Sequence, residues 1–159
     1  MRRGQLLFLI GVCACASLKT GSIQMNGDEY KAVDLDFENC AMGKSYKFIE
    51  VMVPVEFKLS KHDNDGFCEY RFAYKNEAIF YVSSNTFSGS MLNYENRLKN
   101  HISTYSTNRS ENDTIRNNGR EMNGKYWLEW INGGYAIGYF NADDSLKFEE
   151  TLASIKLSN

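Results

Sequence analysis

Apolar and polar residues alternate most regularly along residues 47–59. The apolar face of this segment consists of Ile49, Val51, Val53, Val55, Phe57 and Leu59. A period of two over this length predicts a strand with one buried face. Pro54 lies within the segment and cannot donate a ladder hydrogen bond, so we expect the strand at a sheet edge or with a bulge.

The same alternation predicts strands over residues 30–37, 68–74 and 78–83. Polar turns at residues 61–66 and 76–77 separate the later segments, which indicates an antiparallel meander. Two further strands are predicted over residues 126–131 and 135–140. Asn132-Gly133-Gly134 joins them, and Asn-Gly favours a hairpin because both residues tolerate positive φ.

Helical spacing replaces the strand pattern in two places. Residues 92–105 and 145–157 each carry apolar residues on one side, and Asp143 or Asp144 is the expected N-cap of the second helix. Residues 106–118 are rich in Asn, Ser and Thr, which predicts an exposed loop. The expected fold class is α+β: one domain, residues 28–159, with an antiparallel sheet of about five to six strands and two helices on one face.

The C-terminal third combines an aromatic hairpin, the run Gly138-Tyr139-Phe140, and a helix with Phe148, Leu152 and Ile155 on one side. This order resembles small PsbP-like α/β/α domains. The resemblance implies a layered α/β fold and carries no activity.

The N-terminus has the pattern of a secretory signal. Arg2 and Arg3 precede an apolar run over residues 6–12, and small residues follow. The run is shorter than the roughly 20 residues that a membrane-spanning helix needs. We interpret residues 1–16 as a signal peptide and residues 17–27 as a flexible tether. The alternative is a buried apolar segment of a cytosolic protein.

Two cleavage sites are compatible with this signal. Val12-Cys13-Ala14-Cys15 resembles the lipobox of bacterial lipoproteins, which implies cleavage before Cys15 and a lipid, including palmitate, on Cys15. Ala14-Cys15-Ala16 instead matches an A-x-A site that would release a soluble protein. The first alternative makes the chain a small bacterial envelope lipoprotein on a membrane facing the periplasm, and the second a periplasmic or secreted protein.

Two of the four cysteines lie outside the signal region, Cys40 and Cys68. An oxidising compartment predicts a disulfide between them, which would contribute about 3 kcal/mol in the loop-entropy model. Two buried free thiols are the alternative. A zinc site is not expected, because zinc usually takes four ligands or three and a water.

Charge restricts the partners. The chain of 159 residues has a net charge of −2, and it has no basic cluster outside the signal, so nucleic-acid binding is not expected. The ten Tyr and ten Phe residues suffice for an apolar core.

No residues with a catalytic, cofactor or metal motif stand out. His62 in a polar turn and His101 on a predicted helix lack a nucleophile motif. The turn from Asp63 to Gly66 fails the spacing of a calcium loop. Thr114, in Asp113-Thr114-Ile115, resembles an O-glycosylation signal of some Gram-negative envelope proteins.

Aromatic residues are the candidate binding surface: Tyr126, Trp127, Trp130 and Tyr135. Tyr126 and Trp130 share one face of a strand and Trp127 lies on the other. An exposed Trp127 would stack on a sugar or anchor a protein, and the alternative is that a helix or loop covers it.

These observations favour a non-enzymatic, exported and lipid-anchored binding protein with a protein partner in the envelope. An inhibitor or immunity protein that neutralises a periplasmic toxin or enzyme is the first alternative. A hydrolase using carboxylates such as Glu50 and Glu56 is the second.

Overall fold

The structure is a computed structural model, and it describes residues 16–40, 46–86, 90, 102–109, 114–132 and 134–158, with the backbone alone for residues 16–20 and 102–109. Its elements are β1 (Ala16–Met25), β2 (Asp28–Asp36), β3 (Phe48–Pro54), β4 (Lys58–Asn64), β5 (Phe67–Ala73), β6 (Ile79–Ser83), β7 (Ile102–Arg109), β8 (Ile115–Glu121), β9 (Tyr126–Ile131), β10 (Ala136–Ala142), α2 (Leu146–Ala153) and β11 (Lys156–Ser158).

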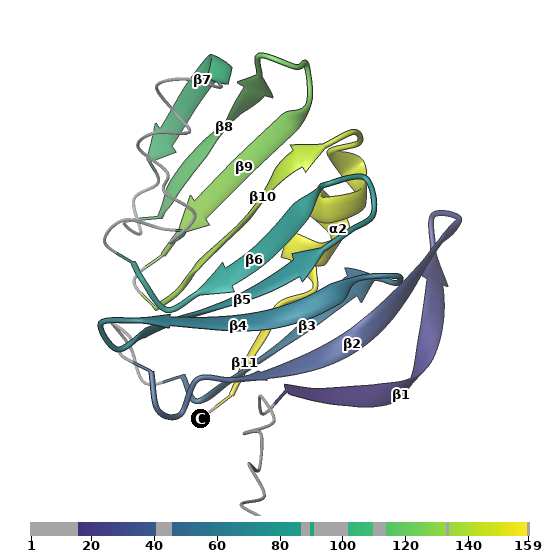
Figure 1. Ribbon diagram of the computed structural model, residues 1–159, viewed down its shortest axis with the longest axis vertical. Coiled ribbons are helices and arrows are strands. Elements are labelled where there is room, and N and C mark those ends of the chain that lie inside the picture. Colours follow the sequence, from purple (N-terminus) through teal and green to yellow (C-terminus); the bar gives the residue numbers. More distant parts are fainter. Residues whose placement is uncertain are drawn as a thin grey trace, which may run out of the picture.

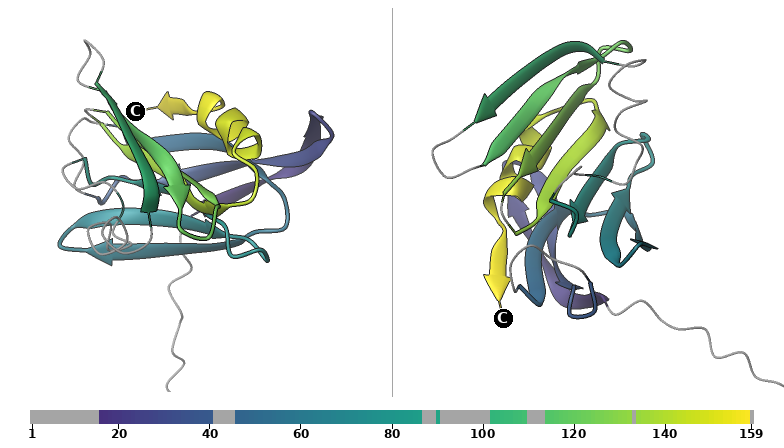
Figure 2. Two further views of the ribbon diagram at one scale, coloured as in Figure 1. Left: turned by 90° about the horizontal axis from the view of Figure 1, so that it is seen from above. Right: turned by 90° about the vertical axis from the view of Figure 1, so that its left-hand side faces the viewer.

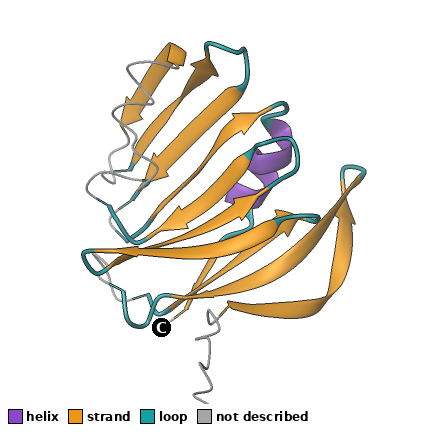
Figure 3. Cartoon of the chain, viewed as in Figure 1, coloured by secondary structure: helices purple, strands orange, loops and turns teal. Residues whose placement is uncertain are grey.

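The strands form two antiparallel sheets (Figure 1). Sheet A has the order β1-β2-β3-β11, and sheet B has the order β4-β5-β6-β10-β9-β8-β7. Within the described residues α2 is the single helix, as the secondary-structure colouring of Figure 3 shows. The predicted α+β fold with one sheet and two helices is therefore wrong, and the layering differs from the α/β/α arrangement that the PsbP-like resemblance implies.

The core lies between the inner faces of the two sheets, with α2 packed against β3 and β10 (Figure 2). Sheet A contributes Val33, Leu35, Ile49, Val51 and Val53, which confirms the alternation seen in the sequence. Sheet B contributes the apolar side of β5, β6, β9 and β10. Phe148 and Leu152 on the buried side of α2 belong to the same core.

The long alternating segment 47–59 bends between the sheets instead of forming one strand. Glu56 has a φ of 65°, and the bend that it makes passes the chain from β3 in sheet A to β4 in sheet B. Beyond the residues of β3 that pair with β11, the Met52 N–H donates a hydrogen bond to Ser154 Oγ. Pro54 is the last residue of β3, beyond the pairing of β11 with residues 48–50, so its missing donor leaves no ladder position empty.

The predicted tether is a strand. β1 pairs with β2 over residues 16–18 and 22–25, with an irregularity between Leu18 and Ser22. A tight turn at Asn26 (φ 49°) and Gly27 (φ 90°) joins the two strands. The segment lacks the apolar alternation of a strand because β1 is a sheet edge and residues 21–24 are exposed. Its pairing is made by the backbone, which composition does not reveal.

The described parts of the polar segment 106–118, residues 106–109 and 115–118, are strands and not a loop. Residues 102–109 form β7 and residues 115–121 form β8, so the predicted helix 92–105 is wrong over its last four residues, and its remainder lies outside the described residues. β7 and β8 lie at one edge of sheet B, where few apolar residues are needed.

The C-terminal helix is shorter than predicted. Ser145 is its N-cap, and Asp144 Oδ1 accepts a hydrogen bond from the Leu146 N–H at 2.9 Å. The helix ends at Ala153, and residues 156–158 pair with β3 as strand β11.

The predicted disulfide is present. Cys40 and Cys68 are bonded, with their Cα atoms 5.6 Å apart and a separation of 28 residues in the sequence. Cys40 follows β2 of sheet A and Cys68 lies on β5 of sheet B, so the bond links the two sheets. The rings of Phe37 and Tyr70 pack beside it in an edge contact, with centroids 5.1 Å apart.

Candidate functional site

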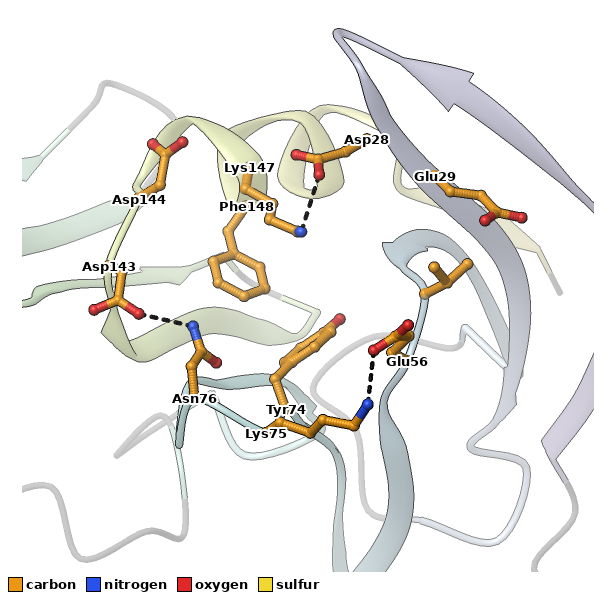
Figure 4. Close-up of a pocket in the computed structure, with 11 residues that line it drawn as sticks. Asp28, Glu29, Glu56, Tyr74, Lys75, Asn76, Asp143, Asp144, Lys147 and Phe148 are labelled. Atoms are coloured by element: carbon orange, nitrogen blue, oxygen red, sulfur yellow. Dashed lines mark hydrogen bonds and ion pairs between the residues drawn. The ribbon is translucent and has the colours of Figure 1, made fainter.

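A hollow of about 400 Å³ opens where β2 and α2 begin, at the end of the molecule that carries the β1–β2 turn (Figure 4). Four segments surround it: the start of β2, the β3–β4 bend, the β5–β6 turn and the first turn of α2 with the residues before it. The lining residues are Asp28, Glu29, Val55, Glu56, Tyr74, Lys75, Asn76, Asp143, Asp144, Lys147 and Phe148.

Backbone conformation explains why polar side chains gather at this rim. Glu56 and Glu77 both have positive φ, at 65° and 66°, which ends one strand and starts the next. Tight turns favour Asp, Asn and Gly and are solvated, so each of them supplies polar groups. The fold places two such turns opposite the N-terminal turn of α2.

The floor of the hollow is aromatic. Phe148 stacks on Tyr139 with ring centroids 5.2 Å apart, and Tyr74 meets its ring edge-on at 5.5 Å. The Tyr74 hydroxyl donates a hydrogen bond to the Pro54 carbonyl at 3.1 Å. Burial raises the pKa of Tyr74 far above its usual value, so the floor stays neutral.

Ion pairs cross the hollow from one wall to another. Lys147 Nζ lies 3.2 Å from Asp28 Oδ1 and so joins α2 to β2. Lys75 Nζ lies 3.0 Å from Glu56 Oε2 on the opposite wall. Both pairs are largely solvated, and exposed pairs of this kind contribute little to stability, so a ligand could displace either one.

A second hollow, of about 480 Å³, lies on the other side of the Lys147–Asp28 pair. It shares Asp28, Asp144 and Lys147 with the first hollow. Its other lining residues are Asn26, Tyr30, Leu146, Glu149, Glu150 and Ala153. Leu146 is 72% exposed and lies among the lining residues of this hollow. We call the two hollows together the acidic groove.

Seven carboxylates and two lysines line the acidic groove: Asp28, Glu29, Glu56, Asp143, Asp144, Glu149 and Glu150, with Lys75 and Lys147. Two cations from outside the lining compensate part of this charge. Arg116 Nη2 lies 2.9 Å from Glu149 Oε1, and Lys125 Nζ lies 3.6 Å from Asp143 Oδ1.

Three carboxylates of the groove have no cationic partner among the described residues: Glu29, Asp144 and Glu150. They accept hydrogen bonds instead from the Ser22 hydroxyl, the Leu146 N–H and the Asn26 amide, respectively. One oxygen of Glu150, Oε2, is shielded from solvent and accepts no hydrogen bond from the part of the chain that the structure describes. The groove therefore carries an excess of negative charge.

The pKa of Tyr30 reflects the negative charge of the groove. Its hydroxyl donates to the Lys147 carbonyl at 2.9 Å. Burial raises the pKa of Tyr30, and the carboxylates of Glu150 and Asp28 raise it further because they disfavour a second negative charge. The groove is suited to a cationic group and unsuited to an anion.

The four aromatic residues that we predicted as a binding surface do not form an exposed patch. Trp127 is 1% exposed and Tyr135 is buried, while Tyr126 and Trp130 are half-buried and pack against the core. Trp127 lies on the opposite face of β9 from Tyr126 and Trp130, as alternation predicts. Both faces of β9 are covered, so the covered alternative for Trp127 is the correct one.

The remaining predicted sites are dispersed. Thr114 is half-buried just before β8, and Cys15 and His101 lie outside the described residues. Glu50 pairs with Lys156 on sheet A while Glu56 pairs with Lys75 at the groove, so these two glutamates do not meet.

His62 lies on β4 and not in the predicted turn, with its Nε2 3.0 Å from Ser60 Oγ. Partial burial lowers the pKa of His62, and Arg71 lowers it further. Asp63 lies close to Cys40 and Cys68, but these cysteines form a disulfide and offer no thiolate to a metal.

Sequence reasoning missed a buried polar network on the outer face of sheet B. Glu69 and Glu129 are both fully buried there. Ser90 joins them, since its Oγ donates to Glu69 at 3.1 Å and its N–H donates to Glu129 at 3.0 Å. Arg71 Nε lies 2.6 Å from Glu69, and the Tyr81 hydroxyl donates to Glu129 at 2.7 Å. Glu69, Glu129, Ser90 and Tyr81 are buried, and Arg71 keeps 17% of its side chain exposed.

One pattern in the sequence points to that network. Trp127, Ala136 and Phe140 are apolar on the face of β9 and β10 that does not meet the core, so this face must be covered too. A glutamate on a covered face is expected in a hydrogen-bonded cluster. The acidic groove has no such signal, because its residues come from four separate turns and strand ends.

No protein family, curated protein or solved structure matches this chain. Among the described residues, no helix combines the length and the apolar character needed to cross a bilayer.

Proposed function

We propose that this chain is an exported, lipid-anchored binding protein of the bacterial envelope, and that it binds a cationic segment of a protein partner in the acidic groove without catalysing a reaction. The observation that carries this proposal is the set of three groove carboxylates, Glu29, Asp144 and Glu150, that lack a cationic partner among the described residues. A cation in the groove would compensate them.

The shape of the groove defines the partner more closely. Lysine and arginine side chains pair a charged end with an apolar stem. The Phe148 floor and the exposed Leu146 would contact the stem, and the carboxylates would contact the charged end. Two adjoining hollows suit a peptide with two or more basic residues. Electrostatic attraction of this kind raises the association rate and makes binding sensitive to salt.

Two features support the location. The basic, apolar and small-residue pattern of the first sixteen residues is typical of a secretory signal, and Cys15 follows a lipobox-like sequence. The disulfide between Cys40 and Cys68 fits an oxidising compartment such as the periplasm. We assign the chain to the cell envelope on these grounds.

An inhibitor of a basic toxin or enzyme is the second candidate, because the same groove would cover a basic active-site surface. The two candidates differ in what binding does. An inhibitor abolishes the activity of its partner at one-to-one stoichiometry, whereas a binding protein leaves it intact.

Affinity for a basic peptide tests the proposal. The peptide Lys-Phe-Lys-Phe-Lys is titrated by calorimetry into the wild type and into the double variant Glu29→Gln, Glu150→Gln. Two solvated charge contacts of about 0.5 kcal/mol each predict about a fivefold loss of affinity in the variant. Higher salt should weaken wild-type binding further.

Glu38→Gln is the control for a carboxylate outside the groove. It removes one negative charge, where the double variant removes two, and it lies at the other end of sheet A beside Lys47. It should bind as the wild type does. Equal affinity in all three proteins, or no binding by the wild type, would reject the groove as a site for cations.

A further inference from the structure

One row of backbone pairs crosses all four strands of sheet A. It runs from Ala16 on β1 through Leu35 and Ile49 to Leu157 on β11. The next row outward contains Asp36, Phe48 and Ser158. We call the end of sheet A formed by these two rows the terminal rim.

The chain enters the fold at this rim. Ala16, the residue that follows Cys15 in the sequence, is the first residue of β1. A lipid on Cys15 would therefore have no tether between the bilayer and the sheet. Acyl chains that enter a membrane at Cys15 bring the terminal rim to within a few ångströms of the lipid headgroups.

We propose that the terminal rim is a membrane-contacting surface, with Phe48 and Leu157 against the lipid interface and the acidic groove facing away from it. This inference rests on the lipid-anchored form of the proposed function. It adds an orientation and a second contact beside the lipid itself.

The side chains of the rim fit an interfacial environment. Five large apolar side chains are exposed in the described residues, and two of them, Phe48 at 39% and Leu157 at 37%, lie on the rim. Lys47 is exposed next to Phe48 and pairs with Glu38. An aromatic residue with a neighbouring lysine is a common combination at a membrane surface, where the ring enters the headgroup layer and the ammonium stays hydrated.

The same register fixes the position of the groove. Asp28 lines the groove at the opposite end of β2 from Leu35, seven residues away. At about 3.4 Å per residue this separates the groove from the rim by about 24 Å along the strand. In Figure 1 the start of β1 and the C-terminus lie at the bottom, and the β1–β2 turn lies at the upper right. The groove would thus be open to a partner in the aqueous phase.

Depth-dependent fluorescence quenching tests this orientation. The full chain is produced with its lipid, purified and reconstituted into vesicles of phosphatidylethanolamine and phosphatidylglycerol. An environment-sensitive fluorophore is attached at Phe48→Cys, and at Met122→Cys as a matched control. Met122 is also an exposed apolar residue, at 73%, but it follows β8 and is not part of the rim.

Nitroxide-labelled lipids should quench the fluorophore at residue 48 at least several-fold more than the one at residue 122. Equal quenching at the two positions, while the protein floats with the vesicles, would overturn the orientation and leave the lipid anchor intact. Failure of the protein to float, together with an intact mass lacking lipid, would overturn the anchor and the rim together. Peptide binding by the unlipidated Cys15→Ser chain reports on the groove independently of both.

Discussion

Gly138 on β10 lies beneath the hydrogen bond between Tyr81 and Glu129 in the buried polar network of sheet B, where a side chain would not fit. A Cβ at this position would lie 2.1 Å from the Leu128 carbonyl oxygen and 2.8 Å from the Tyr81 hydroxyl. The absence of a side chain lets Tyr81 extend across β10 to Glu129. Tyr81 also stacks on Phe140 with ring centroids 5.3 Å apart.

Gly138→Ala should therefore lower the free energy of unfolding by about 3 kcal/mol, because the backbone of β9 cannot move away from the new methyl group. Gly134→Ala is the control. Its Cβ would meet the end of the Tyr46 ring, which can rotate, so its cost should be about 1 kcal/mol or less. Urea unfolding of both variants measures the difference, and equal costs would contradict the close packing at Gly138.

Tyr74 makes stability dependent on alkaline pH. Its pKa is raised by burial in the folded protein, while in the unfolded chain a tyrosine ionises near pH 10. Below that pH both states hold the proton. Above it the unfolded state alone loses the proton, so the free energy of unfolding falls as pH rises, by up to about 1.4 kcal/mol per pH unit for each such tyrosine.

Tyr74→Phe removes this dependence at the cost of one hydrogen bond to Pro54, about 1 kcal/mol at neutral pH. Urea unfolding at intervals from pH 8 to pH 11 should show that the free energy of unfolding declines less steeply in the variant than in the wild type. Some decline should remain in the variant, because the raised pKa values of Tyr30 and Tyr139 contribute in both proteins. Parallel curves for the two proteins would contradict the burial of Tyr74.

Elements with apolar alternation were predictable from the sequence, and elements held by backbone pairing were not. Val33, Leu35, Ile49 and Val51 identify β2 and β3 because one face of each meets the core. β1 and β8 have no such stripe, since they lie at or near sheet edges. The bend at Glu56 was not predictable either. The apolar residues stay on the core side as the chain passes from sheet A to sheet B, so the alternation continues through the bend.

β1 gives a prediction at this scale. Residues 22–25 pair with β2, so those of their amides that donate to β2 should exchange with deuterium markedly more slowly than the amides of an unstructured tether. Mass spectrometry of peptides covering this segment measures the rate. Complete exchange of these amides within seconds would contradict the pairing of β1 with β2 and would favour the flexible tether that the composition predicts.

We propose different roles for the two ends of sheet A. Sheet A runs from the terminal rim, where the chain enters at Ala16, to the β1–β2 turn beside α2. Neither end was predictable as a site. Trp127, the main candidate among the aromatic residues, is buried. The charged residues of the groove come from four segments of the chain and meet only in the folded protein.

The measurement that tests this account most directly is an NMR titration of the ¹⁵N-labelled protein with Lys-Phe-Lys-Phe-Lys. Binding in the acidic groove predicts amide shifts at residues 28–29, 56, 74–76 and 143–150, decreasing as salt is added. Shifts confined to another surface, or none at saturating peptide, would contradict the claim that this groove is where the protein binds its partner.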